Sequence, residues 1–352
     1  MTDISQELIA RVRQASHDGT ALQIMGGGSK QFMGREPIGD PISLSEHKGI
    51  ISYEPIELVL TARAGTSITE INSALAEHNQ CLAFEPPTFD GQATLGGTLA
   101  CHLSGPARPW SGSIRDHVLG IRLINGHAEE LRFGGQVMKN VAGYDVSRMQ
   151  AGAMGTLGII TELSLKVMPK PAATVTIKQE MDAAKAIETM NRLSGKSKPL
   201  TGACWFDNHL YLRLAGARSA VDSTVNQWQG AILEDTDAFW SMLREQQLDY
   251  FLDASSLWRF SVKSSAAHML PEEDWLIDWG GSQRWLRGDF TVDKLEALAE
   301  AAGGQVSLYR GGDRSQEVFH TQSEALQKLH QRLKHAFDPN GVFNPNRLYS
   351  WM

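Results

Sequence analysis

Glycine is concentrated in one part of this chain of 352 residues. Residues 86–160 contain 13 glycines, about twice the density expected from a usual glycine content of about 7%. Glycine costs backbone entropy, and it is favoured where φ must be positive or where the backbone must approach another group closely. The stretch from Glu85 to Asp116 includes the turn Thr94-Leu95-Gly96-Gly97 and the pair Ser104-Gly105. We expect its backbone to lie close to a flat, phosphate-bearing ligand.

A second glycine cluster lies near the start of the chain. Ala21–Met25 is predicted to be a short strand, and it runs directly into Gly26-Gly27-Gly28-Ser29-Lys30. Clustered glycines followed by a hydroxyl and a lysine can present backbone N–H groups to a phosphate. The spacing fits neither the dinucleotide fingerprint, which would need glycine at Gln31, nor a P-loop. On this loop alone, a phosphate site and a plain glycine-rich connection both remain open.

Composition excludes several classes of protein. The net charge of −7 argues against a general nucleic-acid binder, which would carry a basic patch. The longest apolar runs are far shorter than a membrane span of about 20 residues, and residues 2–19 are predicted to form an amphipathic helix rather than a secretory signal. Cys81, Cys101 and Cys204 are too widely spaced for a disulfide framework, a zinc site or an iron–sulfur cluster. These features suit a reducing cytoplasm.

The first 170 residues alternate strands and helices. A strand is expected at Leu58–Ala62, and a helix from Gly65 to about His78 with Thr66 or Ser67 as its N-cap. Val118–Ile124 and Ala128–Phe133 are predicted to pair across Asn125-Gly126, because this dipeptide favours tight hairpins. A strand at Ile159–Val167 follows, and Pro169 and Pro171 end the domain.

The second half has a different order of elements. Strands are expected at 174–179, 203–206, 210–214 and 231–233, and helices at 182–193 and 218–228. The order β-α-β-β-α-β is that of the ferredoxin-like unit, and a weaker second copy is expected over 257–309. A final helix at 322–337 leads into a tail. A chain of this length exceeds one core, so we expect domains at 1–170 and 171–321, with 322–352 returning to the first.

Several motifs occur together in one order. They are Pro86, Thr94-x-Gly96-Gly97, Ser104-Gly105, Gly155-Thr156-Leu157-Gly158-Ile159-Ile160 and Asp338-Pro339…Asn344-Pro345. In this order they resemble the vanillyl-alcohol-oxidase (PCMH-type) FAD-binding family, closely over 20–170 and 337–348. Lys139-Asn140-Val141-Ala142-Gly143-Tyr144-Asp145 is similar to the D-lactate and glycolate dehydrogenase branch. The short length and Gly134–Lys139 look most like the small FAD-binding subunits of bacterial glycolate oxidase complexes.

The resemblance implies an α+β fold, with a PCMH-type FAD-binding domain of two α/β subdomains and a ferredoxin-like C-terminal cap domain. FAD would lie between the subdomains. By this resemblance its pyrophosphate would be held by Gly26, Gly27, Gly28, Ser29 and Lys30 on one side and Thr94, Gly96 and Gly97 on the other. The matching Pro86, Ser104, Gly105, Gly155, Gly158 and Ile160 would line the rest of the cofactor.

The resemblance also suggests how FAD is attached. Many relatives link the flavin to a histidine just after the first glycine loop, where this chain has Ser29-Lys30-Gln31. Non-covalent FAD is therefore expected. His102 lies in the second motif, and we interpret it as a polar or structural histidine beside the cofactor, with a covalent linkage as the alternative.

The catalytic equipment departs from the family pattern. Oxidising a 2-hydroxy acid requires a base for the hydroxyl proton and a cation for the carboxylate. Catalytic relatives carry a histidine-rich, metal-binding segment, and the nearest match here, Tyr309–Arg314, has no histidine. The catalytic residues are therefore unknown and no metal is expected. Arg310 could face the flavin or be an ordinary surface arginine, and His320 and His335 are expected to face solvent.

These features favour an FAD-dependent oxidoreductase acting on CH–OH groups, as one subunit of a complex that oxidises glycolate to glyoxylate. A larger homologous FAD-binding subunit would act on the 2-hydroxy acid, and an iron–sulfur subunit would carry electrons onward. The chain would be cytoplasmic and reach the inner face of the membrane only through partners. An autonomous FAD-dependent oxidase or dehydrogenase, and a structural subunit with a vestigial flavin site, remain alternatives.

Tryptophan gathers in the second half of the chain. Six of the nine tryptophans lie between residues 228 and 285. Core packing is the simpler explanation, and a partner interface, where tryptophan is enriched, is the alternative.

Overall fold

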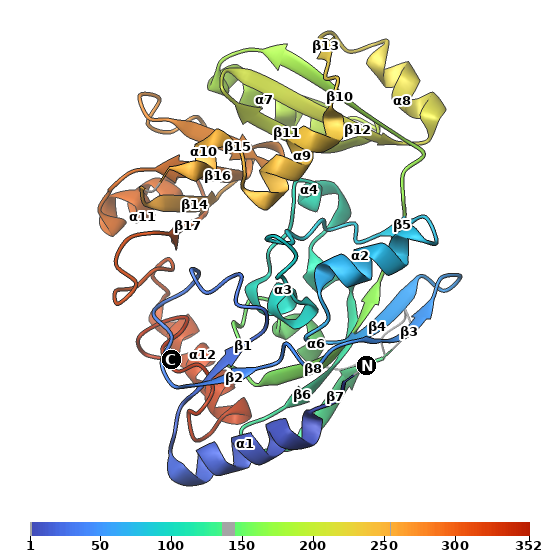
Figure 1. The fold of residues 1–352 in the computed structure, drawn as a ribbon. Coiled ribbons are helices and arrows are strands. Elements are labelled where there is room, and N and C mark those ends of the chain that lie inside the picture. The colour runs from blue at the N-terminus through green and yellow to red at the C-terminus, as the bar shows by residue number, and fades with distance from the viewer. Residues whose placement is uncertain (1, 136–144, 254) are drawn as a thin grey trace. The chain divides into compact units, whose positions relative to one another are not determined.

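The computed structural model describes residues 2–135, 145–253 and 255–352, in which the chain forms two compact units (Figure 1). The first unit comprises Met1–Leu103, Ser113–Pro169 and Arg314–Met352, and the second comprises Ser104–Gly112 and Lys170–Asp313. The expected domain boundaries at residues 170 and 321 stay a prediction, because compact units need not be independent domains. The motif over residues 139–144 lies outside the described residues.

The N-terminal elements of the first unit meet the end of the chain. Helix α1 (Ser5–Asp18) buries Leu8, Val12 and Ala15 on one face, as its helical spacing predicts. Strand β1 (Leu22–Met25) pairs in parallel with β2 (Asp40–Ser43). On its other side Leu22 bridges Phe343, which follows the last helix, α12 (Glu324–Phe337). The C-terminal tail therefore lies beside β1, as Figure 1 also shows.

An antiparallel sheet of five strands forms the other layer of the first unit. Its order is β3-β4-β8-β6-β7, and the strands span Ile50–Glu54, Val59–Arg63, Ile159–Lys166, Val118–Ile124 and Glu130–Gly134. Helix α2 (Ile68–Ala76) buries Ile68, Ile71 and Leu75 completely, and the Ser67 side chain caps it by accepting the Glu70 N–H. Helix α3 (Leu95–Cys101) lies against β8 and β4. Shorter elements are β5 (Gln80–Cys81), β9 (Met168–Pro169), α5 (Ile114–His117) and α6 (Val146–Met149).

The β6–β7 connection is longer than the two-residue turn expected at Asn125-Gly126. The Asn125 N–H donates to the Glu129 carbonyl, and its side-chain oxygen accepts the N–H groups of His127 and Glu129. An added Cβ at Gly126 would lie 2.8 Å from the Cα of Asp338. Glycine is present here because the C-terminal segment packs on the loop, and a tight turn is not the reason.

The second unit begins with the ferredoxin-like unit that the sequence predicts. Its strands are β10 (Ala173–Glu180), β11 (Leu200–Phe206), β12 (His209–Gly216) and β13 (Ala231–Ile232), and its helices are α7 (Ala183–Ser194) and α8 (Arg218–Val225). The strands lie in the order β13-β10-β12-β11. The β11–β12 turn has positive φ at both Asp207 and Asn208, as a tight primed turn requires.

A second copy continues the same sheet. Its elements are β14 (Leu257–Ser261), β15 (Trp275–Asp278), β16 (Gln283–Arg287), α11 (Val292–Ala301) and β17 (Gln305–Arg310). Its strands lie in the order β15-β16-β14-β17, and β15 pairs with β11, so the two copies make one eight-stranded sheet. Counted outward from the β11–β15 junction, the two copies have the same strand order. This copy has no helix between its first two strands. The buried Arg284 of β16 donates to the carbonyls of Ala266 and Ala267 in that connection, and to the carbonyl of Gly281. Helices α9 (Thr236–Glu245) and α10 (Asp249–Leu252) join the copies.

Five of the six clustered tryptophans are buried, with at most 5% of each side chain exposed; they are Trp240, Trp258, Trp275, Trp279 and Trp285. Several pack edge-to-face on neighbouring rings, as Trp285 does on Tyr309 and Phe251. Burial of this kind supports core packing as the reason for the cluster.

Candidate functional site

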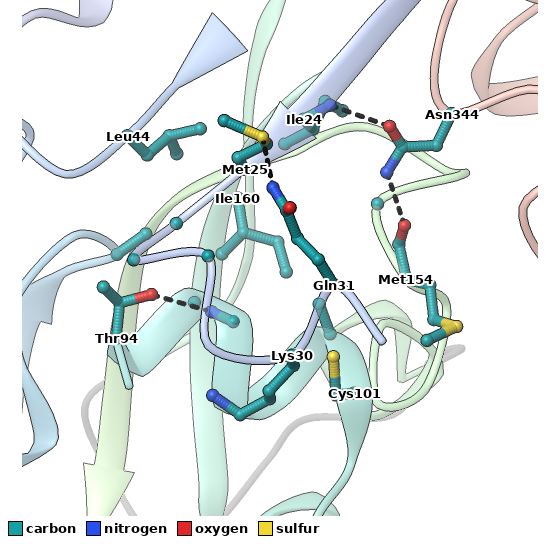
Figure 2. Close-up of a pocket in the computed structure, with 18 of the residues that line it drawn as sticks. Ile24, Met25, Lys30, Gln31, Leu44, Thr94, Cys101, Met154, Ile160 and Asn344 are labelled. Carbon is teal, nitrogen blue, oxygen red and sulfur yellow. Dashed lines mark hydrogen bonds between the residues drawn. The ribbon is translucent and has the colours of Figure 1, made fainter. Parts of the chain in front are cut away.

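A cleft in the first unit is formed by β1, the loop that follows it, α3 and the segment from Met154 to Ile160 (Figure 2). Most residues expected at a cofactor line it, namely Gly26, Gly27, Gly28, Ser29, Lys30, Thr94, Gly96, Gly97, Gly155, Gly158 and Ile160. The fold thus brings three segments that are distant in sequence to one place.

Three expected residues are not among those that line the cleft. Pro86 is buried elsewhere in the first unit. Ser104 and Gly105 belong to the second unit, where the Gly105 carbonyl accepts the indole N–H of Trp279 at 3.0 Å. A role for these three at the cofactor stays a prediction.

Several glycines of the cleft are needed because other protein segments approach them. An added Cβ at Gly26 would lie 2.2 Å from Thr94 Oγ1, and one at Gly27 would lie 1.8 Å from the Gln92 carbonyl oxygen. One at Gly96 would lie 2.7 Å from the Ala64 Cβ. From the sequence, we expected this glycine density to serve a ligand. The structure shows that some of these glycines are needed because the two glycine loops pack on each other.

The first glycine loop leaves its backbone donors unused. Within the part of the chain that the structure describes, the N–H groups of Gly26, Gly27, Gly28 and Ser29 donate to no acceptor. Polar backbone groups that lack a protein partner are normally satisfied by water or a ligand. Consecutive N–H groups of this kind form a concave site for an anion.

The charge of the cleft is positive although the chain is acidic. Lys30 and Arg347 line it, and none of the described residues around it is Asp or Glu. Lys30 is only 7% exposed, and its Nζ atom lies 3.2 Å from Ser29 Oγ. Two buried cations without a lining carboxylate favour a negatively charged group on the ligand.

Arg347 also fixes the shape of the glycine loop. Its Nη2 donates to the Gln31 carbonyl at 2.9 Å, and its Nη1 donates to the Arg35 carbonyl. Burial lowers the pKa of Arg347 from its ordinary value, but an arginine remains protonated near neutral pH. The charged side chain of Arg347 therefore holds the end of the first glycine loop in place.

Apolar side chains form the rest of the lining. Ile24, Met25, Leu44, Met154 and Ile160 contribute carbon and sulfur surface, which suits the faces of a planar ring system.

A side chain from the tail ties this wall together. Figure 2 shows Asn344 between two segments: its Oδ1 accepts the Ile24 N–H at 2.7 Å, and its Nδ2 donates to the Met154 carbonyl at 2.6 Å. Asn344 thus joins β1 to the loop that carries Gly155. Sequence reasoning noted the tail motif that contains Asn344, but it did not place Asn344 or Arg347 in the site.

Cys101 lines the cleft as well. Burial raises the pKa of its thiol, and the nearby charges of Lys30 and Arg347 only partly oppose this effect. The thiol is thus the stable form near neutral pH.

The side chains considered for catalysis or for flavin attachment are not among those that line the cleft. His102 does not line the cleft, and its Nε2 lies 2.9 Å from Ser113 Oγ. Arg310 is in the second unit and donates to the Phe251 carbonyl at 2.8 Å. His335 is exposed, but His320 is only 8% exposed, so its expected position in solvent was wrong. The Tyr349 hydroxyl donates to the His320 carbonyl.

The described residues contain no cluster of His, Cys, Asp and Glu that could hold a metal ion. Nor do they contain a helix that is both long and apolar enough to cross a membrane. No histidine or carboxylate is among the described residues that line the cleft.

Comparison with known proteins gives these features a context. Residues 4–134 match the family model described as an FAD binding domain. The glycolate oxidase subunit GlcE of Escherichia coli is 44% identical over 349 residues, which cover 99% of this chain and 98% of that protein. The glycolate oxidase subunit GlcD of Bacillus subtilis is 33% identical over 154 residues, or 43% of this chain and 33% of GlcD.

Solved structures agree on the fold. A 4-ethylphenol oxidase from Gulosibacter chungangensis matches with a TM-score of 0.72, covering 97% of this chain and 87% of that one at 14% identity. The expected α+β fold, an FAD-binding part followed by a ferredoxin-like part, is confirmed.

Proposed function

The chain belongs to the family of the glycolate oxidase subunit GlcE, and we propose that it is the FAD-holding subunit of a complex that oxidises glycolate to glyoxylate. It is an FAD-dependent oxidoreductase component acting on CH–OH groups, and its cofactor is FAD. The observation that carries the proposal is the cleft of the first unit. Its four unused N–H groups and two cations, with no lining carboxylate among the described residues, match the needs of a dianionic pyrophosphate.

The proposal gives each part of the cleft a task. The N–H groups of Gly26–Ser29 and the Nζ of Lys30 hold the pyrophosphate, and Arg347 keeps the loop in shape. Ile24, Leu44 and Ile160 exclude water from the faces of the ring. FAD supplies the two-electron chemistry when it is bound, and it is held without a covalent bond. Pro86, Ser104 and Gly105 are proposed to contact parts of the cofactor outside this cleft.

We further propose a division of labour between subunits. None of the described residues that line the cleft is a histidine or a carboxylate that could remove a hydroxyl proton, so a larger homologous flavin subunit would oxidise the 2-hydroxy acid. Three widely spaced cysteines cannot hold an iron–sulfur cluster, so an iron–sulfur subunit would pass electrons on. This chain would either relay electrons or support the catalytic subunit. It would be cytoplasmic and meet the membrane through its partners.

These points can be tested by purifying a tagged copy of the chain, both alone and after coexpression with the proposed flavin and iron–sulfur subunits. The chain alone should release about one FAD on mild denaturation, and the flavin should not bleach when glycolate is added anaerobically. The coexpressed chain should bring a second flavoprotein and an iron–sulfur protein with it. Absence of FAD would indicate a structural subunit with a vestigial site. Bleaching by glycolate or D-lactate in the isolated chain would instead show an autonomous enzyme.

A further inference from the structure

Two arginines of the second unit lie over one indole ring. The Cζ of Arg108, in α4 (Arg108–Ser111), lies 4.3 Å from the centre of the Trp279 ring. The Cζ of Arg259, on β14, lies 5.2 Å from the same centre and 5.9 Å from that of Trp285. An indole attracts a cation to its face, but two cations at one ring also repel each other.

Arg259 has no acidic partner among the described residues. Its Nε donates to Gln283 Oε1 at 2.8 Å, and no carboxylate lies within ion-pair distance of its guanidinium in the described part of the chain. An arginine has five N–H donors, so the four on the two Nη atoms have no protein acceptor there. Neither Nη atom is sealed away from solvent. A partly buried charge of this kind is costly unless something pairs with it.

Other arginines of the same sheet are satisfied. Arg213 stacks on Trp240, and its guanidinium donates to both oxygens of Thr201. Arg287 stacks on Tyr250 and pairs with Asp274. Stacking on an aromatic ring is therefore common in this unit, whereas free Nη donors beside a second cation set Arg259 apart.

The residues around Arg259 are buried and hydrogen-bonded. Trp279 is 3% exposed, has a φ of 53°, and donates its indole N–H to the Gly105 carbonyl. A positive φ at such a bulky residue is strained, and strain of this kind collects at functional sites. Gln283 is 5% exposed and fixes the Arg259 fork by its hydrogen bond.

We infer that Arg259 binds the carboxylate of a small 2-hydroxy acid through its Nη groups, with Arg108 adding positive potential at the Trp279 face. A guanidinium fork matches a carboxylate in a planar, two-bond geometry. The choice of a 2-hydroxy acid rests on the proposed function, because it is the substrate of the proposed complex; this chain would bind the acid without oxidising it. The site itself rests on the second unit alone. Burial and the charge of Arg108 lower the pKa of Arg259 to about 10, and a bound carboxylate opposes both effects.

The test is a titration of the purified full chain with glycolate and with oxalate, a non-oxidisable dicarboxylate, followed by calorimetry and by tryptophan fluorescence. Arg259→Gln should weaken oxalate binding by at least about tenfold, since it removes charged hydrogen bonds. Arg259→Lys, which keeps the charge and loses the fork, should give an intermediate loss. Arg287→Gln removes the same charge from the same sheet, and it should leave the affinity within about twofold because that arginine is already paired.

Three outcomes would overturn the inference: no binding to the wild-type chain, an equal loss in Arg259→Gln and Arg287→Gln, or full affinity in Arg259→Gln. Binding of sulfate or phosphate as tight as that of oxalate would show a general anion site and would also reject a carboxylate site. FAD content is measured on the same samples. A chain that lacks FAD but still binds oxalate would refute the proposed function alone, and a yellow chain without oxalate binding would refute this inference alone.

Discussion

The Nζ atom of Lys334 lies 2.6 Å from Oδ2 of Asp338, and both side chains are buried. Lys334 Nζ also donates to the carbonyls of Thr156 and Phe343. Asp338 in turn accepts the N–H groups of Val342 and Phe343. This buried pair joins the last helix, the C-terminal tail and the segment that carries Gly155 and Gly158, so it supports one wall of the cleft.

Lys334→Met should strongly destabilise the first unit. The substitution leaves the Asp338 carboxylate buried without its cation, and breaking a buried pair costs about 3–5 kcal/mol. The free energy of unfolding measured in urea checks this. Lys328→Met is the matched control, because Glu324 and Lys328 form an exposed pair with the same i,i+4 spacing on the same helix. That control should change stability by about 0.5 kcal/mol or less, and equal losses in the two variants would refute the role of burial.

Gly27→Ala should abolish retention of FAD. Its Cβ would overlap the Gln92 carbonyl oxygen, so the loop would have to shift and its N–H groups would lose their arrangement. Gly19→Ala is the control, since an added Cβ at Gly19 would have no atom within 4 Å; unlike Gly27, Gly19 has a positive φ of 66°. It should keep its FAD at a cost of about 1–2 kcal/mol in stability. The measurement is the amount of FAD per chain, from the absorbance after gel filtration. A Gly27→Ala protein with a full complement of FAD would show that the loop does not hold the cofactor.

Lys30→Met should weaken FAD binding by about tenfold or more, because a charged hydrogen bond to the pyrophosphate contributes about 1.5–3 kcal/mol. Lys30→Arg should restore part of the affinity, and Lys48→Met, at an exposed lysine, should have no effect. Titration of the apoprotein with FAD, followed by flavin fluorescence, gives the dissociation constants. The wild-type affinity should also fall with added salt more steeply than that of Lys30→Met. If Lys30→Met and the wild-type chain bind FAD with the same affinity, the pyrophosphate does not lie at Lys30.

His47 should make the first unit less stable in mild acid. The side chain is 1% exposed, and burial lowers its pKa. The charge of Arg63 lowers the pKa further, while that of Asp3 opposes the shift. Because the unfolded chain binds the proton at a higher pH, stability is lost as pH falls below about 6.5.

His47→Gln should flatten this loss, while His127→Gln, at an exposed histidine, should leave it unchanged. Melting temperatures between about pH 7.5 and about pH 5.5 measure the slope. A slope in His47→Gln equal to that of the wild type would assign the pH dependence to other groups.

The elements that the sequence predicts well are those with strong local signals. Ile68, Ile71 and Leu75 share one helical face after the Ser67 cap, and α2 forms there. The order of strands and helices in the second half was enough to predict both ferredoxin-like copies. Strand β2 has only Ile42 buried, so no alternation marks it in the sequence.

The site was predictable only in part, because glycine loops are visible in a sequence and long-range partners are not. Asn344 reaches Ile24 across 320 positions and Met154 across 190. Arg347 supports the first glycine loop from 316 positions away. No local pattern marks such contacts, which depend on where the tail returns.

The return of the tail to β1 sets the order in which the molecule can be completed during its synthesis. Leu22 bridges Phe343, and Asn344 fastens Ile24 to the Met154 loop. A nascent chain emerges from the ribosome with its N-terminus first, so β1 gains this neighbour only after about 320 further positions have been translated. We expect the cofactor cleft to be completed only when that segment has emerged, so that FAD is loaded late in synthesis.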